Sequence, residues 1–178
     1  YDDMENLKPV IPEGNSDSAS LDNVFELLSM SGHSAPLTKL MLIPDAWSKK
    51  SKILPKNQLK LFNFLNSTME PWDGPAALAG TDNEWVIAAS DRNGLRPLRF
   101  TITRDKLLFA GSETGMVDLN EKKIVRKGRL GPGEIIGVRI EKGKVFTNSQ
   151  IKDYLAKEYK HFNNQIIDLD KKFPIEKE

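Results

Sequence analysis

The 178-residue sequence contains no cysteine, and this absence excludes several kinds of chemistry. Without cysteine the chain forms no disulfide, offers no thiolate to a metal and supplies no cysteine nucleophile, while the redox compartment stays undetermined. Histidine is almost as scarce, because His33 and His161 are the only two and are far apart in the sequence. They lack the short spacing of metal-binding histidines, so we expect no dedicated metal site.

An excess of one charge and long apolar runs are missing as well. Charged residues make up 29% of the chain but leave a net charge of only +1, which argues against a nucleic-acid-binding surface. No apolar run is long enough for a membrane span. The start of the chain has neither the basic nor the apolar region of a signal peptide, and it lacks an initiator methionine. We therefore expect that upstream sequence was removed, and that the remaining length forms one domain.

The sequence predicts a mainly helical region over residues 16–68, after an irregular lead-in over residues 1–15. Apolar residues recur at helical spacing in three segments, which gives each predicted helix one apolar stripe for packing. The segments run from Ser16 to a stop signal at Ser31-Gly32, over residues 37–41 before Pro44, and over residues 59–65.

From Pro75 onward the pattern changes to short apolar runs separated by turn residues, which predicts antiparallel sheet over residues 75–147. The gaps between the runs are too short for the crossovers that parallel strands need, so we expect an antiparallel meander. A C-terminal helix and a charged tail are expected over residues 151–178. The predicted strands are 76–79, 85–89, 98–103, 107–110 and 135–140. Helices and antiparallel strands in separate stretches indicate the α+β class.

The most distinctive stretch is Asp-Arg-Asn-Gly-Leu-Arg-Pro-Leu at residues 91–98. Asn-Gly favours a tight turn, and proline fixes its own backbone while extending the residue before it. We therefore expect Asp91, Arg92 and Arg96 to be held on one stiff corner. On composition alone, the simpler interpretation is a hairpin turn with solvated charges. The Ser-Asp-Ser at residues 16–18 likewise has a plain interpretation, as the N-cap of the first helix.

Taken together, the motifs resemble the second half of a class II glutamine amidotransferase domain, and most closely that of the glutamate synthase family. The resemblance covers about residues 17–157 and depends on four stretches in the family's order. They are Ser-Asp-Ser with the helix that follows at residues 16–28, Glu-Pro-Trp-Asp-Gly-Pro-Ala-Ala at 70–77, the stretch at 91–98, and Gly-Ser-Glu-Thr-Gly-Met-Val at 111–117. The implied fold is part of the αββα sandwich of N-terminal nucleophile hydrolases, in which two antiparallel sheets pack between helical layers.

The resemblance also implies a site. In the family, the aspartate of Ser-Asp-Ser receives the α-ammonium group of substrate glutamine, through a charge-assisted hydrogen bond, and Asp17 is the matching residue. Asp91, Arg92 and Arg96 would support the site. The N-terminal cysteine nucleophile and the Asn-Gly pair of the oxyanion hole lie outside this chain, so no catalytic residue is assigned and the chain alone is expected to be inactive.

The implied enzyme is larger than this chain. It would hydrolyse glutamine and pass the ammonia to 2-oxoglutarate to make glutamate, in the cytoplasm or a plastid. FMN, an iron-sulfur cluster and NADPH or ferredoxin would belong to other domains of the enzyme, with no cofactor in this chain. The expected partners are glutamine, the remaining domains of the large subunit and a small reductase subunit, with no nucleic acid and no membrane.

Two other interpretations stay open on the sequence. A class II amidotransferase of the phosphoribosyl-pyrophosphate type shares the Gly-x-Arg-Pro-Leu corner, although the stretches at 16–28 and 70–77 favour glutamate synthase. A noncatalytic domain that binds glutamine or serves as a scaffold would also explain the missing cysteine.

Overall fold

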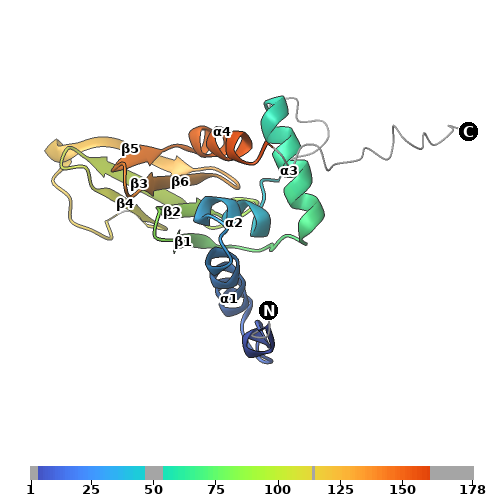
Figure 1. The fold of residues 1–178 in the computed structure, drawn as a ribbon. Coiled ribbons are helices and arrows are strands. Elements are labelled where there is room, and N and C mark those ends of the chain that lie inside the picture. Colours follow the sequence, from blue (N-terminus) through green and yellow to red (C-terminus); the bar gives the residue numbers. More distant parts are fainter. Residues whose placement is uncertain (1–3, 47–53, 114, 161–178) are drawn as a thin grey trace, which may run out of the picture.

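A computed structural model of the chain describes residues 4–46, 54–113 and 115–160. Four α-helices and seven strands lie within these ranges (Figure 1). The helices are α1 (Asp17–Met30), α2 (Ala35–Leu42), α3 (Lys56–Thr68) and α4 (Asn148–Glu158), with short 3-10 helices at Met4–Leu7 and Glu121–Lys123. The strands are β1 (Ala77–Thr81), β2 (Trp85–Ser90), β3 (Leu98–Thr103), β4 (Leu108–Gly111), β5 (Ile124–Leu130), β6 (Ile135–Arg139) and β7 (Lys144–Phe146). The charged tail predicted for the end of the chain lies outside the described residues from residue 161 onward.

Local signals explain where the helices begin and end. Ser16 caps α1 by accepting a hydrogen bond from the backbone of Ala19, as short polar residues at an N-cap do. Proline stands in the first turn of α2, where its missing N–H costs nothing, and α2 ends just before Pro44. A capping box formed by Thr147 and Gln150 starts α4. This helix therefore begins three residues earlier than the sequence predicts.

The strands form two antiparallel sheets, and the expected single meander is wrong. One sheet has the order β1-β2-β6-β7 and the other has the order β4-β3-β5. The chain leaves the first sheet after β2, at the corner of residues 91–97, and β3 starts the second sheet. Strand β6 then returns to pair with β2. A pattern of apolar runs gives the strands but not this change of sheet.

Strands β5 and β7 were not predicted. Most side chains of β5 are exposed, and its sequence Ile-Val-Arg-Lys-Gly-Arg-Leu places charged residues where an apolar run would signal a strand. Strand β7 has only three residues and begins at Lys144, which the sequence places in a turn. Both strands are specified by pairing with a neighbour rather than by their own composition.

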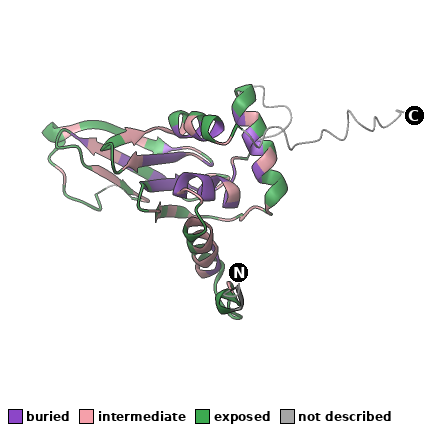
Figure 2. Ribbon diagram, in the orientation of Figure 1, coloured by how far each residue is buried: buried purple, intermediate pink, exposed green. Residues whose placement is uncertain are grey.

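The core has layers that follow from these sheets (Figure 2). Helices α2 and α4 pack on one face of the four-stranded sheet, and α3 packs against both of these helices, around buried side chains such as Leu40, Phe62 and Trp85. The opposite face packs on the three-stranded sheet through Ile136 and Phe100. Helix α1 projects from this body and is joined to it by a smaller apolar cluster (Figure 1). The layers confirm the α+β class, and one helical layer of an αββα sandwich is formed by the described residues.

Candidate functional site

Asp17 lies at the start of α1. It is the first residue of the helix, its side chain is exposed, and no described residue forms a hydrogen bond or ion pair with it. The positive end of the helix dipole favours a carboxylate at this position. The N-cap itself is Ser16, as predicted, so the carboxylate of Asp17 is not used to start the helix and can accept from a molecule outside the chain.

An open groove of about 570 Å³ runs between α1 and β1. Asp17 is not among its lining residues, but the lining begins at the next residue, Ser18. Asp22 and Glu26, one helical turn apart, line the same groove together with residues 76–83. Strand β1 pairs only with β2 within the described residues, so its other edge faces the groove region unpaired. The start of α1 and this groove therefore form an acidic surface, which suits an ammonium group.

A close contact between Phe25 and Gly80 positions α1 on β1. A Cβ atom on Gly80 would lie 2.7 Å from the Cζ atom of the Phe25 ring, closer than real Cβ contacts occur. The absence of a side chain at Gly80 thus lets the ring lie directly on the strand backbone. Phe25 and Gly80 both line the groove.

Asp91 organises the corner between the two sheets. Its side chain is only 1% exposed, and its carboxylate accepts four backbone N–H groups. Oδ1 accepts from Asn93 at 3.0 Å and Leu95 at 2.9 Å, and Oδ2 accepts from Arg96 at 2.9 Å and Ala76 at 3.3 Å. Burial alone would raise the pKa of Asp91, but the four backbone donors outweigh it and lower the pKa below its ordinary value. The carboxylate is therefore a structural acceptor for the whole turn.

The two arginines of the corner have no such role in the structure. Arg96 is exposed and Arg92 is half-buried, and neither guanidinium forms a hydrogen bond or ion pair with any described residue. Gly94 adopts a φ of +66°, which suits glycine in a tight turn. The backbone of the corner is stiff, as expected, but the structure does not bring Arg92 or Arg96 into contact with Asp17.

A buried charge cluster lies near the corner and was not predicted from the sequence. Lys39 on α2 is 1% exposed, and its ammonium donates to the backbone carbonyl of Gly133 at 2.5 Å. Lys152 on α4 is 3% exposed, forms an ion pair with Asp45, and lies over the Phe62 ring at 5.5 Å from the centroid. The only sequence signal was a lysine inside the apolar run of α2. Lys39, Asp45 and Lys152 come from α2, the segment after it and α4, and no spacing pattern in the sequence predicts that they meet.

Burial lowers the pKa of Lys39 to about 8, and the positive charge of Lys152 adds to this effect. Asp45, Asp91 and Glu134 oppose it by favouring the charged ammonium. Carboxylates on three separate segments thus partly compensate the cost of burying this charge.

Neither a metal-binding cluster nor a membrane-spanning helix is present in the part of the chain that the structure describes. Within residues 4–46, 54–113 and 115–160, no three histidine, aspartate or glutamate side chains are grouped so that they could hold a metal ion. In the same ranges, every helix is too short or too polar to cross a membrane.

Two facing antiparallel sheets, with helices over the outer face of one of them, agree with the fold of the N-terminal nucleophile hydrolase class. Residues 1–164 match the family described as class II glutamine amidotransferases, and the chain belongs to this family.

Similar proteins come from bacteria and fungi. The chain is 54% identical over 153 residues to the glutamate synthase [NADPH] large chain of Azospirillum brasilense, which covers 86% of this chain and 10% of that protein. It is 35% identical over 158 residues to the large chain of Bacillus subtilis, covering 89% and 10%. It is 38% identical over 173 residues to the glutamate synthase [NADH] of Saccharomyces cerevisiae, covering 95% and 8%. The chain therefore spans about a tenth of the length of these relatives.

These relatives confirm the predicted kinship with glutamate synthases. The amidotransferase of the phosphoribosyl-pyrophosphate type is not better supported, because the chain belongs to the class II glutamine amidotransferases and the relatives named here are glutamate synthases. The predicted roles of Asp17, Asp91, Arg92 and Arg96 stay predictions.

Proposed function

We propose that this chain forms the glutamine-binding half of the amidotransferase domain of a glutamate synthase. The complete enzyme would hydrolyse glutamine with an N-terminal cysteine supplied from outside these residues, and it would pass the ammonia to 2-oxoglutarate. The cysteine thiolate would attack the side-chain amide of glutamine, ammonia would leave, and water would hydrolyse the thioester to glutamate. This chain would contribute substrate binding rather than a reacting group.

The observation that carries this proposal is the exposed carboxylate of Asp17, which has no partner among the described residues and directly precedes the first residue that lines an acidic groove. A free amino acid carries an α-ammonium group, which a carboxylate binds through a short, charge-assisted hydrogen bond. Asp22 and Glu26 extend the negative charge along the groove and would attract the same group. Asp91 would support the site by holding Ala76, which lines the groove, in place. Arg92 and Arg96 would contact parts of the enzyme outside this chain.

Steady-state kinetics on the full-length enzyme test the role of Asp17. Replacing Asp17 with alanine removes the charged acceptor, and we expect a loss of ~1.5–3 kcal/mol in glutamine binding, seen as a KM for glutamine raised roughly 10- to 150-fold. Asp118→Ala is the matched control, since Asp118 is also an exposed carboxylate but lies outside the groove. An unchanged KM for glutamine in Asp17→Ala would remove Asp17 from the site.

The cofactors of the proposed enzyme would be held elsewhere. Iron-sulfur clusters are bound mainly by cysteine thiolates, and this chain has none to offer. We therefore assign the cluster, FMN and the binding of NADPH or ferredoxin to the remaining domains or to a small reductase subunit. The names of the relatives include both NADPH and ferredoxin as electron donors. One relative from Arabidopsis thaliana is named chloroplastic, which agrees with a location in the cytoplasm or a plastid.

A further inference from the structure

We propose that Lys39 is a positioning residue for glutamine binding, which holds the turn at residues 131–134 against the corner at 91–97 and thereby fixes the wall of the α1–β1 groove. The kinetic consequence of this inference rests on the proposed function. Lys39 itself touches neither the groove nor Asp17, so it would act only through the residues between them.

The first step is the contact between two turns. The Lys39 ammonium donates to the carbonyl of Gly133, and the N–H of Gly133 donates to the carbonyl of Asp91 at 2.8 Å. The same Asp91 carbonyl accepts from the N–H of Gly94 at 3.1 Å. Pro132 also packs closely on Gly94, where an added Cβ would lie 3.0 Å from the Pro132 Cγ atom. The buried Lys39 ammonium therefore holds Gly133, the residue through which the turn at 131–134 contacts the corner at 91–97.

The second step leads from the corner to the groove. Asp91 and Ala76 are joined twice, because Asp91 donates its N–H to the Ala76 carbonyl at 3.1 Å and accepts the Ala76 N–H on Oδ2. Ala76 lines the groove together with Ser18, the residue after Asp17. A continuous series of hydrogen bonds thus connects the Lys39 ammonium with the groove wall.

A positioning role explains why a charge is buried here. Desolvation of an ammonium costs several kcal/mol, and an apolar side chain of similar volume would usually pack at least as stably. Burial accordingly lowers the pKa of Lys39, although Asp45, Asp91 and Glu134 keep the charged form favourable enough to persist at neutral pH. The neighbouring positions Leu37 and Leu40 are apolar and fully buried. The lysine therefore provides a donor that the surrounding core could not.

Lys152 offers a matched control. It is buried to a similar extent, but its ammonium pairs with Asp45 and lies over Phe62, and no hydrogen bond joins it to either turn. Lys39→Met and Lys152→Met remove the same group from the same cluster. A merely structural role would give both variants the same phenotype.

The test compares both variants in the full-length enzyme. For Lys39→Met we expect a KM for glutamine raised about tenfold, with kcat within about twofold, because the loss is in the geometry of the binding site. For Lys152→Met we expect a lower Tm and a KM within about twofold of the parent. An unchanged KM in folded Lys39→Met, or an equal rise in both variants, would overturn the inference.

A second variant covers the case in which Lys39→Met does not fold. Gly94→Ala should push the two turns apart, because the added Cβ atom meets Pro132 and the backbone φ is +66°. The substitution does not alter any residue of the buried cluster. Its control is Gly143→Ala, where φ is +54° but nothing lies within 4 Å of the added atom. We expect a raised KM for glutamine in the first variant alone. Equal KM values in Gly94→Ala and the parent would count against the inference.

Amide hydrogen exchange separates this inference from the proposed function. In Lys39→Met, the amides of Leu95 and Arg96, which donate to Asp91, should exchange faster than in Lys152→Met. If the enzyme hydrolyses no glutamine, the proposed function fails. Faster exchange in Lys39→Met would then still support the role of Lys39 in stabilising the corner at 91–97. Unchanged exchange together with an unchanged KM, in an enzyme that does hydrolyse glutamine, would overturn the role of Lys39 alone.

Discussion

At the scale of single residues, the molecule uses buried charges as backbone acceptors and donors. Asp91 accepts four N–H groups, and Lys39 donates to a carbonyl that no helix or strand satisfies. Both pKa values lie below the ordinary ones, but for different reasons: burial lowers the pKa of Lys39, whereas the backbone donors lower the pKa of Asp91 against the effect of burial. Both groups therefore make the stability of the domain rise with pH, each in its own pH range.

Replacing Asp91 with asparagine should destabilise the domain. The amide nitrogen cannot accept the two N–H groups that one carboxylate oxygen now binds, so we expect the free energy of unfolding at neutral pH to fall by ~1.5–3 kcal/mol. Because the folded pKa of Asp91 is lowered, its contribution is present above the unfolded pKa of about 3.9 and is lost as the pH falls through the folded pKa. Urea unfolding of the parent and variant from pH 7 to pH 3 measures this. Asp118→Asn is the control, and a constant difference between parent and Asp91→Asn at every pH would contradict the account.

Lys39 should produce a trend of the same sign, but at alkaline pH. Its folded pKa of about 8 lies below the ordinary 10.5, so the folded state releases the proton first. Between these two values the unfolded state binds more protons, and the free energy of unfolding should rise with pH in the parent relative to Lys39→Met. Unfolding curves from pH 7 to pH 10 check this. Parallel pH profiles for the two proteins would show that the ammonium is not desolvated as described.

At the scale of elements, periodicity predicted what each segment would become but not which segments would pair. Helices α1, α2 and α3 follow their apolar stripes, and β2 and β3 follow their apolar runs. Strand β5 was not predicted because its exposed Arg126, Lys127 and Arg129 interrupt the apolar run that would indicate a strand. The partner of β2 could not be predicted either, since the corner at 91–97 looks like a hairpin turn in sequence yet sends the chain into a second sheet.

The packing of α1 on β1 gives a prediction at this scale. In Gly80→Ala the new methyl group would overlap the Phe25 ring, so the helix must shift, and we expect a loss of ~1–3 kcal/mol in stability with faster amide exchange in α1. Ala79→Val is the control, because Ala79 is the exposed neighbour on the same strand and valine suits a strand. Equal stability and equal α1 exchange in the two variants would mean that Gly80 does not position the helix.

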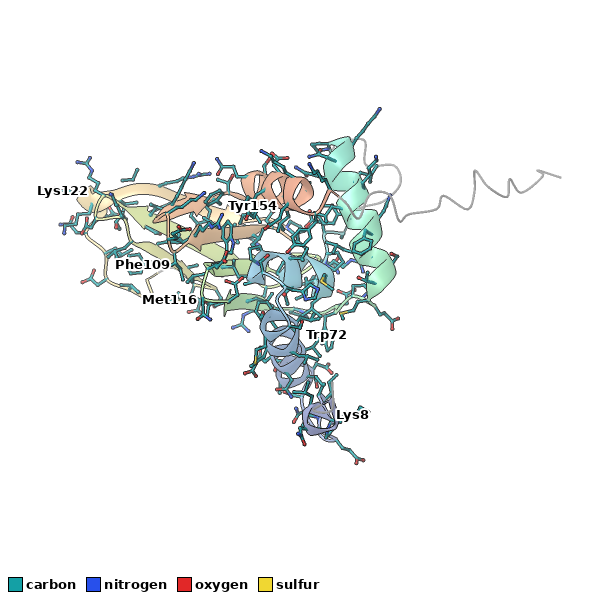
Figure 3. All side chains as sticks on the ribbon, viewed as in Figure 1. Lys8, Trp72, Phe109, Met116, Lys122 and Tyr154 are labelled. Atoms are coloured by element: carbon teal, nitrogen blue, oxygen red, sulfur yellow. The ribbon has the colours of Figure 1, made fainter. Side chains whose placement is uncertain are left out.

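At the scale of the whole molecule, the described residues form one helical layer and two sheets. The outer face of the β4-β3-β5 sheet carries Arg99 directly opposite Arg129, both exposed. A second open cavity is lined by Phe109 and Met116, which are labelled in Figure 3. Like charges facing each other across strands destabilise a sheet. The described residues do not form the second helical layer that the αββα sandwich implies.

The candidate site divides in the same way between what the sequence could and could not predict. Asp17 and the corner at 91–97 each lie within a short, continuous sequence motif. The local geometry of the first follows from helix capping and that of the second from turn chemistry. The cluster of Lys39, Asp45 and Lys152 is assembled only by tertiary packing of α2 on α4 and the sheet. A lysine in an apolar run is the sole local sign of it, and that sign does not identify its partners.

The central claim is that these residues work only as part of a glutamine-hydrolysing domain, and ammonia release from glutamine tests it most directly. The measurement compares the full-length polypeptide that carries these residues with the 178-residue chain alone, under the same conditions. The account predicts ammonia release by the full-length polypeptide and none by the isolated chain, which lacks a cysteine nucleophile. Release by the isolated chain, or no release by the full-length polypeptide, would contradict it.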